Sequence, residues 1–574
     1  MPTAGSGKTL GGNVMQLTGA QIVMECLLEQ GVDTVFGYPG GAVLPIYDAL
    51  YEYSGRIRHI RTCHEQAAAH AADGYARASG KTGVCIATSG PGATNLVTGI
   101  ATAFMDSVPV VAVTGNVTRD LLGLDSFQEV DITGITMPVT KHNYLVKHVE
   151  RLADTIRSAF RIAGSGRKGP VLVDIPKDVT TQKCEFTPRR PEPFPPLPFP
   201  DAGRLAQALD LLENSKRPFF YCGGGVVSSG ASAEAAEFAA KLDAPVSCSL
   251  MCQGGYDQRD GRYLGMLGMH GTKAAGEAVG ECDLLVAAGT RFSDRVLCNA
   301  DLFARRCKII QIEIDTAEFD KNIGADLKLR GDAKAVLAKL NRLLPQQSHP
   351  DWMRLAEGWK RDCPPRRRGG PDQVSPQDVF ETLCRLTGGD AVITTEVGQH
   401  QMWAAQYYTF HSPRRFLTSG GLGTMGFGLG AAIGAKLARP DATVVNAAGD
   451  GSFHMNCAEL STLARYQVPV VELIFDNRTL GMVRQWQKMF FGRRYSQTDL
   501  DGGTDYAMLA GAFGVKALKI AEKREIEPVL REALSCGGPV LVDCLIDKDE
   551  NVLPMVPAGK SVEEPILEIE GGNG

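Results

Sequence analysis

Short apolar runs alternate with helical stretches along most of the chain. Residues 19–30 predict a helix, and TVFGYPGGAV (34–43) begins as a strand and ends in a glycine turn. The segment RHIRTC (58–63) predicts a further strand, followed by a helix, HEQAAAHAADGYARAS, that begins near Glu65. Strands that alternate with helices in this way favour parallel sheets built from βαβ units. The sequence therefore predicts an α/β fold.

Two βαβ stretches resemble each other although they lie far apart in the chain. Residues 83–116 consist of an apolar strand, a glycine turn, a helix and a strand that begins with VPVV. Residues 442–486 repeat this order, including VPVV. Chance similarity between two βαβ units is one explanation. The alternative is that two related open α/β domains flank a middle domain.

Two polar segments predict the domain boundaries. TPRRPEPFPPLPFP (187–200) contains too many prolines for a helix or a sheet, and it should form an extended, semi-rigid linker. A second polar linker is expected at residues 345–376. We therefore expect an N-terminal domain at 15–186, a middle domain at 202–344 and a C-terminal domain at 376–556.

Asp450 and Asn477 each follow an apolar strand in the second βαβ stretch. The carboxyl ends of neighbouring parallel strands lie side by side, so the two side chains should meet. Carboxylate and amide oxygens suit Mg²⁺, which also binds phosphate oxygens. Gly449 and Gly451 allow a close backbone approach, and the start of the following helix attracts anions. The stretch predicts a metal and diphosphate site, with an ordinary strand-to-helix turn as the alternative.

Composition narrows the range of functions. The chain has 574 residues, 44% hydrophobic and 22% charged, and a net charge of -5, which gives no basic excess for a nucleic-acid partner. The basic run 366–368 is interpreted as part of a solvated linker. Fifteen cysteines without a CxxC pair indicate neither a disulfide framework nor a zinc site, and they favour a reducing cytoplasm. No apolar run approaches 18 residues, so no membrane span is expected.

Two glycine motifs are interpreted as coincidental. GSGKT near the N-terminus lacks the first glycine of a P-loop, because Pro2 occupies that position and no strand precedes it. Residues 421–426 match GxGxxG, but no acidic residue ends a strand about 20 residues later, as a nicotinamide site would require.

A longer series of motifs resembles the catalytic subunits of acetohydroxyacid synthase (acetolactate synthase), a family of thiamine diphosphate-dependent enzymes. The motifs occur in the family's order: GYPGG, HEQ, SGPGATN, DSVPVVAVTGN, FQE, DIPKDV, MLGMHG, GQHQMWAAQYY, GTMGFG, GDGSF and GMVRQWQ. Each is weakly specific alone, whereas the ordered set is very specific. The resemblance covers about residues 15–556.

The resemblance implies a fold and a reaction. Three open parallel-sheet domains are expected, with two related thiamine-diphosphate-binding domains on either side of a dinucleotide-binding-like middle domain. The implied cofactors are thiamine diphosphate, Mg²⁺ and FAD. The implied reaction decarboxylates pyruvate and transfers the two-carbon unit to a second 2-ketoacid, pyruvate or 2-ketobutyrate, at the first common step of branched-chain amino acid biosynthesis.

Two alternatives remain open at this point. One is another enzyme of the superfamily, such as a pyruvate oxidase, a glyoxylate carboligase or a 2-ketoacid decarboxylase. The other is a catalytically silent relative that serves as a regulatory subunit. Intact Glu65, Asp450 and Asn477 argue against the second alternative.

The resemblance also implies roles for individual residues. Glu65 matches the acid that hydrogen-bonds the cofactor pyrimidine and supports the tautomer that removes the C2 proton; a Glu that only complements the helix dipole is the alternative. Substrate contacts are expected from Gly41, Phe127, Gln128, Lys177 and Trp486. Cofactor contacts are expected from Tyr38, Pro39, Gly90, Asn95, Val397, Gly398, Gln399, His400, Gly423, Met425, Gly449, Asp450, Gly451, Ser452, Asn477, Gly481 and Met482. The metal ligands would be Asp450, Asn477 and Thr479.

A second group of residues matches family positions for FAD. It comprises Arg167, Gly223, Gly224, Met269, His270, Gly289, Arg291, Arg295, Glu313 and Asp332, with Asp315 beside them at a strand end. The sequence departs from the family at Ser293, where Asp is usual, and at Cys298, where Gly is common. The flavin is expected to be structural, because the net reaction transfers no electrons to an acceptor.

The family also implies partners. In this superfamily, Glu65 and the diphosphate site that act on one cofactor come from different chains. We therefore expect a homodimer or homotetramer, together with a small regulatory subunit, in the cytoplasm.

Overall fold

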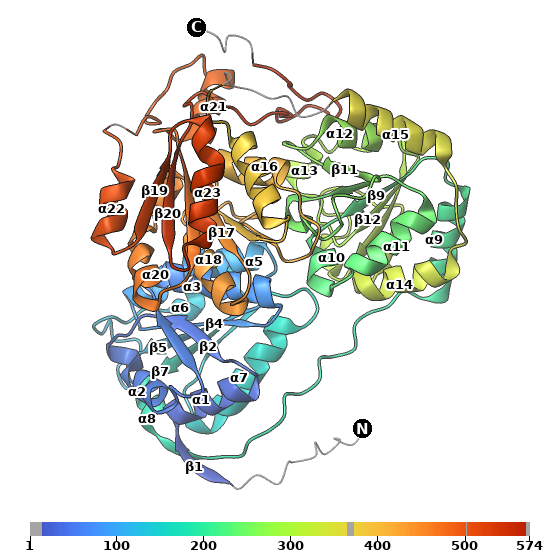
Figure 1. Ribbon diagram of the computed structural model, residues 1–574. Coiled ribbons are helices and arrows are strands. Elements are labelled where there is room, and N and C mark those ends of the chain that lie inside the picture. Colours follow the sequence, from blue (N-terminus) through green and yellow to red (C-terminus); the bar gives the residue numbers. More distant parts are fainter. Residues whose placement is uncertain (1–13, 364–371, 501, 570–574) are drawn as a thin grey trace. The chain divides into compact units, whose positions relative to one another are not determined.

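The computed structural model describes residues 14–363, 372–500 and 502–569 (Figure 1). The GSGKT segment and the basic run 366–368 lie outside the described residues. Three six-stranded sheets, parallel throughout, and one two-stranded antiparallel sheet organise the described chain. The predicted α/β fold is therefore confirmed. None of the described helices is long and apolar enough to cross a bilayer.

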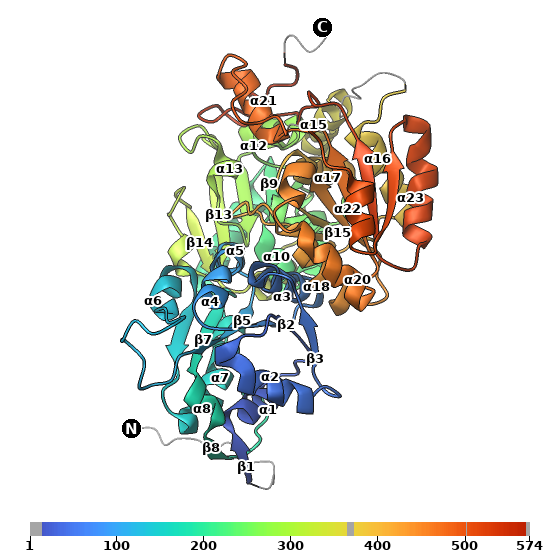
Figure 2. The ribbon, with the colours of Figure 1, turned by 90° about the vertical axis from the view of Figure 1, so that its left-hand side faces the viewer.

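The first sheet has the strand order β3-β2-β4-β5-β7-β6. Its inner strands β4, β5 and β7 are mostly apolar and buried along their whole length, because helices cover both faces of the sheet. Figure 2 shows α1, α2 and α7 on one face and α3 on the other. The strands are β2 (Thr34–Gly37), β3 (Arg58–Arg61), β4 (Gly83–Ala87), β5 (Val110–Asn116), β6 (His142–Leu145) and β7 (Val171–Pro176). The helices are α1 (Gly19–Glu29), α2 (Leu44–Glu52), α3 (Glu65–Ser79), α4 (Pro91–Asn95), α5 (Val97–Met105), α6 (Ile132–Thr136), α7 (Val149–Gly164) and α8 (Lys177–Thr181).

A short antiparallel pair, β1 (Met15–Thr18) and β8 (Lys183–Phe186), joins the two ends of this region. The sequence pattern did not predict it. Each strand has four residues, too few for a clear alternation of apolar and polar positions.

The third sheet, β16-β15-β17-β18-β20-β19, repeats the topology of the first. In both sheets, the first strand along the chain lies between the second and the third. The last strand lies between the fourth and the fifth, and the fifth forms the edge of the sheet. The predicted relation between the two βαβ stretches is therefore confirmed. The strands are β15 (Val392–Thr395), β16 (Phe416–Leu417), β17 (Val444–Gly449), β18 (Val470–Asp476), β19 (Lys516–Ile520) and β20 (Val540–Leu545). The helices are α16 (Pro376–Thr387), α17 (Gln399–Tyr407), α19 (Asp450–Phe453), α21 (Gly481–Phe490), α22 (Tyr506–Ala512) and α23 (Ile526–Ser535).

The middle sheet has the order β11-β10-β9-β12-β13-β14, which is the order of a dinucleotide-binding fold. Figure 1 shows α9, α11 and α14 along one face and α12 with α15 along the other. The strands are β9 (Pro218–Cys222), β10 (Val246–Cys248), β11 (Tyr263–Met266), β12 (Leu284–Ala288), β13 (Lys308–Glu313) and β14 (Leu327–Arg330). The helices are α9 (Ala202–Asn214), α10 (Gly224–Ser229), α11 (Ser232–Leu242), α12 (Lys273–Glu281), α13 (Asp294–Leu297), α14 (Ala333–Leu343) and α15 (Pro350–Asp362).

The expectation of a polar linker at 345–376 is wrong in part, because the segment contains α15. Trp352 is buried in the core of the middle sheet, and its indole N–H donates to the Pro218 carbonyl at 2.8 Å. Trp359 meets Trp352 edge to face at 5.7 Å between ring centroids. Apolar side chains at 352, 356 and 359 have helical spacing, so the segment carries a weak helix signal within a polar composition.

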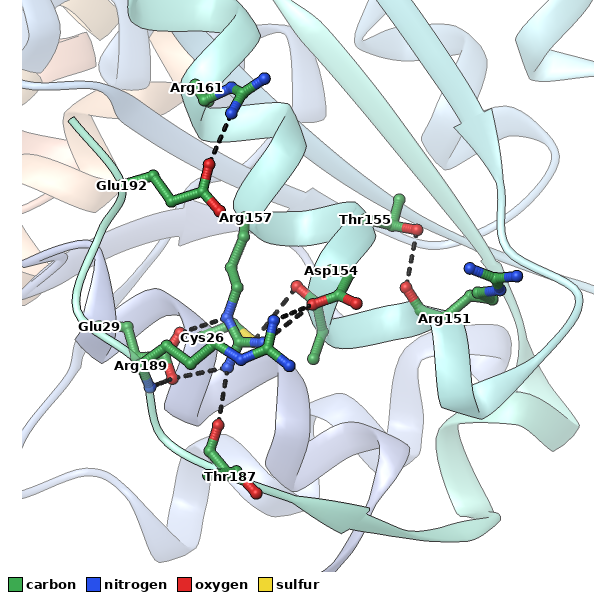
Figure 3. Close-up of polar contacts among 11 residues, drawn as sticks. Cys26, Glu29, Arg151, Asp154, Thr155, Arg157, Arg161, Thr187, Arg189 and Glu192 are labelled. Carbon is green, nitrogen blue, oxygen red and sulfur yellow. Dashed lines mark hydrogen bonds and ion pairs between the residues drawn. The ribbon is translucent and has the colours of Figure 1, made fainter. Parts of the chain in front are cut away.

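The first linker contains no helix or strand between Phe186 and Ala202, as predicted. Its beginning is nevertheless held in place, as Figure 3 shows. Arg157 on α7 forms two hydrogen bonds of 2.8 Å with Glu29 at the end of α1 and donates to the Thr187 carbonyl at 3.1 Å. The Arg189 backbone N–H also donates to Glu29 at 2.7 Å, and its guanidinium donates to Asp154 at 3.0 Å. Proline content thus predicted the extended chain, whereas ion pairs hold its first residues in position.

The described chain divides into two compact units. Among the described residues, unit 1 comprises 14–195, 421–439 and 456–468, and unit 2 comprises 196–363, 372–420, 440–455, 469–500 and 502–569. The helices α18 (Gly428–Ala438) and α20 (Leu460–Tyr466) lie between strands of the third sheet along the chain, but they pack within unit 1. The sequence pattern gave no indication of this assignment.

The packing of α18 on α3 yields a stability prediction. A Cβ at Gly434 would lie 1.9 Å from the Ala71 carbonyl oxygen and 2.7 Å from the Tyr75 backbone nitrogen. Because these are backbone atoms of a helix, Gly434→Ala should force the helices apart and cost about 1–3 kcal/mol. We expect a lower urea midpoint for unfolding. Gly511→Ala is the matched control, because nothing lies within 4 Å of its Cβ position and alanine favours a helix. Equal midpoints for the two variants would contradict the close packing.

Candidate functional site

In unit 1, the predicted site residues gather at the carboxyl ends of the strands of the first sheet. They are Tyr38, Pro39 and Gly41 after β2, Gly90 and Asn95 after β4, Gln128 after β5 and Lys177 after β7. Gly423 and Met425 precede α18 in the same unit. A Cβ at Gly40 would lie 2.5 Å from the Thr88 Cβ, and a Cβ at Gly90 would lie 2.9 Å from the Gln128 Cα. The turns after β2 and β4 and the Gln128 loop therefore meet.

Glu65 is the first residue of α3, and its side chain reaches the turn after β4. Its Oε2 accepts a hydrogen bond of 2.9 Å from the Asn95 amide. A Cβ on Gly92 would lie 3.2 Å from the Glu65 Oε1, so a side chain at position 92 would fit only if its neighbours shifted slightly. His64 caps the helix, because its ring nitrogen accepts the Gln66 N–H. The Asn95 amide therefore fixes the position of the Glu65 carboxyl. The helix does not need Glu65 as a cap, because His64 already caps it.

In unit 2, three neighbouring strands of the third sheet end in the predicted metal and diphosphate residues. The ladder pairs Gly449 of β17 with Phe475 of β18, so Asp450 and Asp476 follow side by side, with Asn477 one residue further. On the other side of β17, Val397, Gly398, Gln399 and His400 follow β15. The sheet therefore places the two strand ends that carry Asp450 and Asn477 side by side, and their role as metal ligands stays a prediction.

The surroundings of Asp450 fit a cation. Its Oδ1 accepts the Gly451 N–H at 2.8 Å, whereas its buried Oδ2 has no hydrogen-bond partner. Burial, together with the charge of Asp476, raises the pKa of Asp450 to about 8. A divalent cation would pair the free oxygen and offset the repulsion between the two carboxylates. The Thr479 hydroxyl donates to the Thr498 carbonyl at 2.7 Å, and the Thr479 N–H donates to the Asn477 amide oxygen at 3.2 Å.

Close contacts hold the residues around Asp450 in place. A Cβ at Gly481 would lie 2.0 Å from the Gln399 Oε1, and a Cβ at Gly449 would lie 2.7 Å from a ring nitrogen of His400. Burial lowers the pKa of His400 to about 3, so its ring is neutral at neutral pH. Ser452 donates its hydroxyl to Glu396 at 2.8 Å. A side chain at Gly449 or Gly481 would displace His400 or Gln399, and the bare backbone at these turns suits the close approach of an anion.

Trp486 lies on α21 in a small apolar cluster with Met269. The Arg295 guanidinium carbon lies 6.0 Å from the Trp486 ring centroid, and an Arg295 nitrogen lies 3.6 Å from the Met269 sulfur. Met482, four residues before Trp486, packs against the core of the third sheet. The structure therefore brings a predicted substrate residue and two predicted flavin residues together.

The predicted flavin residues of unit 2 lie around the carboxyl ends of the middle sheet. Gly223 and Gly224 follow β9 and Gly289 follows β12, at the point where the strand order reverses. A Cβ at Gly223 would lie 2.2 Å from the Gly289 carbonyl oxygen, and Gly289 itself has φ +60°. The two turns meet so closely that side chains have no room, which fits the crevice that binds a dinucleotide in such folds.

The acids of this group also have local backbone partners. The Glu313 carboxylate accepts from the Ile314 and Asp315 N–H groups at 2.8 and 3.0 Å. Asp332 caps α14 by accepting from the Ala335 N–H at 3.1 Å.

The basic residues of the group lie in different places. Arg291 lies two residues after Gly289. His270 has a buried Nδ1 without a hydrogen-bond partner, and burial lowers its pKa to about 4. The remaining member, Arg167, belongs to unit 1, where it donates to Ser107 at 2.8 Å.

The two departures from the family pattern flank α13. Ser293 is the N-cap residue of this helix. Cys298 ends it with φ +56°, a conformation that is strained for a residue with a Cβ and free of strain for glycine. This backbone conformation gives the physical reason why glycine suits the position.

The sequence analysis missed three acids near the predicted site residues. Asp476 directly precedes Asn477, Glu396 directly follows β15, and Glu459 contacts the loop before Glu65. Asp476 is the last residue of β18 and Glu396 directly follows β15, so the argument that identified Asp450 could have identified both acids. Glu459 lies in a helical region far from Glu65 in sequence, and only the tertiary contact identifies it.

Comparisons with known proteins agree with this arrangement. Models of the thiamine pyrophosphate enzymes match three parts of the chain: the N-terminal TPP-binding domain at residues 17–135, the central domain at 205–340 and the C-terminal TPP-binding domain at 396–544.

Similar curated proteins span nearly the whole chain. The acetolactate synthase isozyme 2 large subunit of Escherichia coli is 48% identical over 551 residues, which cover 96% of this chain and 99% of that protein. The acetolactate synthase large subunit of Parasynechococcus marenigrum is 48% identical over 561 residues, covering 95% and 90%. A probable acetolactate synthase large subunit of Methanocaldococcus jannaschii is 47% identical over 559 residues, covering 95% and 94%. The chain belongs to the acetolactate synthase large subunit family of thiamine pyrophosphate enzymes.

Proposed function

We propose that this chain is the catalytic subunit of an acetolactate synthase. It would decarboxylate pyruvate and transfer the two-carbon unit to a second 2-ketoacid, releasing one CO₂ for each acetolactate or 2-aceto-2-hydroxybutyrate formed. The observation that carries this proposal is the pair of half-sites: a fixed Glu65 in unit 1, and Asp450 beside Asn477 in unit 2. Full-length relatives named acetolactate synthase support the choice of reaction.

Glu65 would contact the pyrimidine of thiamine diphosphate, which supplies the nucleophilic carbon and the electron sink for decarboxylation. The Asn95 amide holds the Glu65 carboxyl in place at 2.9 Å. The absence of a side chain at Gly92 leaves space beside the Glu65 carboxyl. Glu65 would therefore share a proton with a ring nitrogen and hold the required tautomer. Met425, Gln128, Gly41 and Lys177 complete the proposed surroundings of the reacting atoms.

Asp450, Asn477 and Thr479 would hold Mg²⁺, and the turns at Gly449 and Gly481 would admit the diphosphate. The unpartnered Oδ2 of Asp450 supports this assignment, because a buried carboxylate oxygen without a partner is costly. FAD would lie along the Gly223 and Gly289 turns. The flavin would be structural, because the balanced reaction needs no electron acceptor.

The assembly and compartment are also part of the proposal. We propose a homodimer or homotetramer with a small regulatory subunit, since the relatives are named large subunits. A reducing cytoplasm suits the chain, because all fifteen cysteines lie among the described residues and none forms a disulfide. We propose domain boundaries at 15–186, 202–344 and 376–556, each enclosing one six-stranded sheet.

Product analysis tests the reaction. Purified protein with thiamine diphosphate, Mg²⁺, FAD and pyruvate should form acetolactate and CO₂ in equal amounts without consuming oxygen. Acetaldehyde as the main product would indicate a decarboxylase, and stoichiometric oxygen uptake would indicate an oxidase. Product from glyoxylate but not from pyruvate would indicate a carboligase.

Trp486 is expected to set the preference for the second ketoacid. 2-Ketobutyrate exceeds pyruvate by one methylene, which an apolar pocket discriminates by about 1–3 kcal/mol. Trp486→Leu should therefore lower the ratio of 2-aceto-2-hydroxybutyrate to acetolactate about 10-fold or more in competition assays, while acetolactate formation from pyruvate alone stays largely intact. Trp359→Leu, a tryptophan change in the core of the middle sheet, is the control. An unchanged ratio at a lower total rate would mean that Trp486 only packs its helix.

A further inference from the structure

The loop between β3 and α3 is held by a segment distant in sequence, η5 (Cys457–Glu459) together with α20. Glu459 is completely buried. Its Oε1 accepts hydrogen bonds from the backbone N–H groups of Cys63 at 2.8 Å and His64 at 3.0 Å. Its Oε2 accepts the Thr462 hydroxyl at 2.6 Å. Both carboxylate oxygens are therefore satisfied, and one of them binds the two residues that directly precede Glu65.

Further contacts from the same segment support this arrangement. The Tyr466 hydroxyl accepts the Arg61 N–H at 2.9 Å. The Cys63 sulfur lies 3.4 Å from the Ala458 carbonyl oxygen and 2.8 Å from the Ser461 hydroxyl. Contacts from η5 and α20 thus reach Arg61 at the end of β3 and both Cys63 and His64 in the loop, and all of these residues belong to unit 1.

Stability alone is a poor explanation for this carboxylate. Burial raises the pKa of Glu459 to about 7, so the fold holds a carboxyl whose charge is disfavoured. Two loop N–H groups near a helix start are ordinarily satisfied by a short cap residue or by water. The cap of α3 is already provided by His64. The hydrogen bonds that Glu459 accepts therefore fix the backbone immediately before the proposed catalytic carboxyl of Glu65.

We propose that Glu459 is a positioning residue for Glu65, holding the Cys63 and His64 N–H groups so that the Glu65 carboxyl keeps its place beside Asn95. The inference rests on the proposed function of Glu65. Displacement of a reacting group by about 1 Å can lower a rate about 100-fold, which explains the value of a rigid loop at this point.

Three variants test the proposal. Glu459→Ala removes both acceptors, whereas Glu459→Gln keeps an amide oxygen that can accept the same two N–H groups. Tyr466→Phe is the control within α20, because it removes only the contact with Arg61. Glu459→Asp, which draws the acceptor back by one methylene, replaces the alanine variant if that variant fails to fold.

Three quantities are compared among the variants. Without cofactor, amide hydrogen exchange reports on residues 61–66. With thiamine diphosphate and Mg²⁺, the rate of deuterium exchange at C2 and the Kd of the cofactor are measured. We expect Glu459→Ala to speed exchange of the Cys63 and His64 amides about 10–100-fold and to slow C2 exchange by a similar factor, with little change in Kd. Glu459→Gln should restore most of the amide protection and most of the C2 exchange rate, and Tyr466→Phe should leave C2 exchange unchanged.

The outcomes separate this inference from the proposed function. Unchanged amide exchange in Glu459→Ala, or faster amide exchange with normal C2 exchange, would overturn the positioning role. The proposed role of Glu65 would still stand if Glu65→Gln slowed C2 exchange as expected. If Glu65→Gln itself leaves C2 exchange unchanged, the proposed role of Glu65 fails, and the positioning role fails with it.

Discussion

Glu65→Gln is expected to slow C2 proton exchange of bound thiamine diphosphate about 10²–10⁴-fold while cofactor affinity changes little. The amide of Gln can still lie beside Asn95, but it cannot share a proton with a ring nitrogen as a carboxyl does. Acid-quenched deuterium exchange, followed by NMR, measures the rate directly.

The control for Glu65→Gln is Glu150→Gln. Glu150 lies in the first turn of α7, so it tests whether loss of a helix-dipole contact alone has any effect. We expect normal exchange in Glu150→Gln. Exchange at the normal rate in Glu65→Gln would remove Glu65 from the mechanism and leave only the dipole interpretation.

Asp450→Ala is expected to abolish the Mg²⁺ dependence of cofactor binding and to weaken binding about 100-fold or more. The substitution deletes a charged oxygen donor whose Oδ2 has no partner within the described protein. Isothermal titration calorimetry with thiamine diphosphate, with and without Mg²⁺, gives the affinity and its dependence on the metal.

Asp441→Ala is the matched control for Asp450→Ala. Asp441 is an exposed carboxylate that precedes β17, whereas Asp450 follows it, so the control removes the same charge at the opposite end of one strand. Its binding should remain normal. Retention of the Mg²⁺ dependence in Asp450→Ala would place the metal site elsewhere.

Much of this site could be predicted from local sequence. Asp450 and Asn477 were identified because they follow apolar strands, and parallel pairing brings the ends of such strands together whatever the rest of the fold does. The same argument extends to Gly223 and Gly289 in the middle sheet. These predictions depend on the periodicity of the chain and on neighbouring strands alone.

Other features could not be obtained in this way. The helix α15 was not predicted, because its few apolar residues, among them Trp352, lie within an otherwise polar and charged segment. Glu459 contacts Cys63 and His64 in the loop before Glu65, which lie 396 and 395 positions earlier in the chain. No local pattern distinguishes such a glutamate from one exposed to solvent.

The sequence by itself determined the three α/β domains, the order of their motifs, the strand ends that carry Asp450 and Asn477, and the helix start that carries Glu65. Only the tertiary structure decided that α18 and α20 pack within unit 1, and that Glu459 meets the amides of Cys63 and His64. The physical reason is that hydrogen-bonded strand pairing follows from short-range periodicity, whereas helix packing depends on which distant surfaces have complementary shapes. Gly434 shows this dependence, because its missing side chain has meaning only beside the backbone of α3.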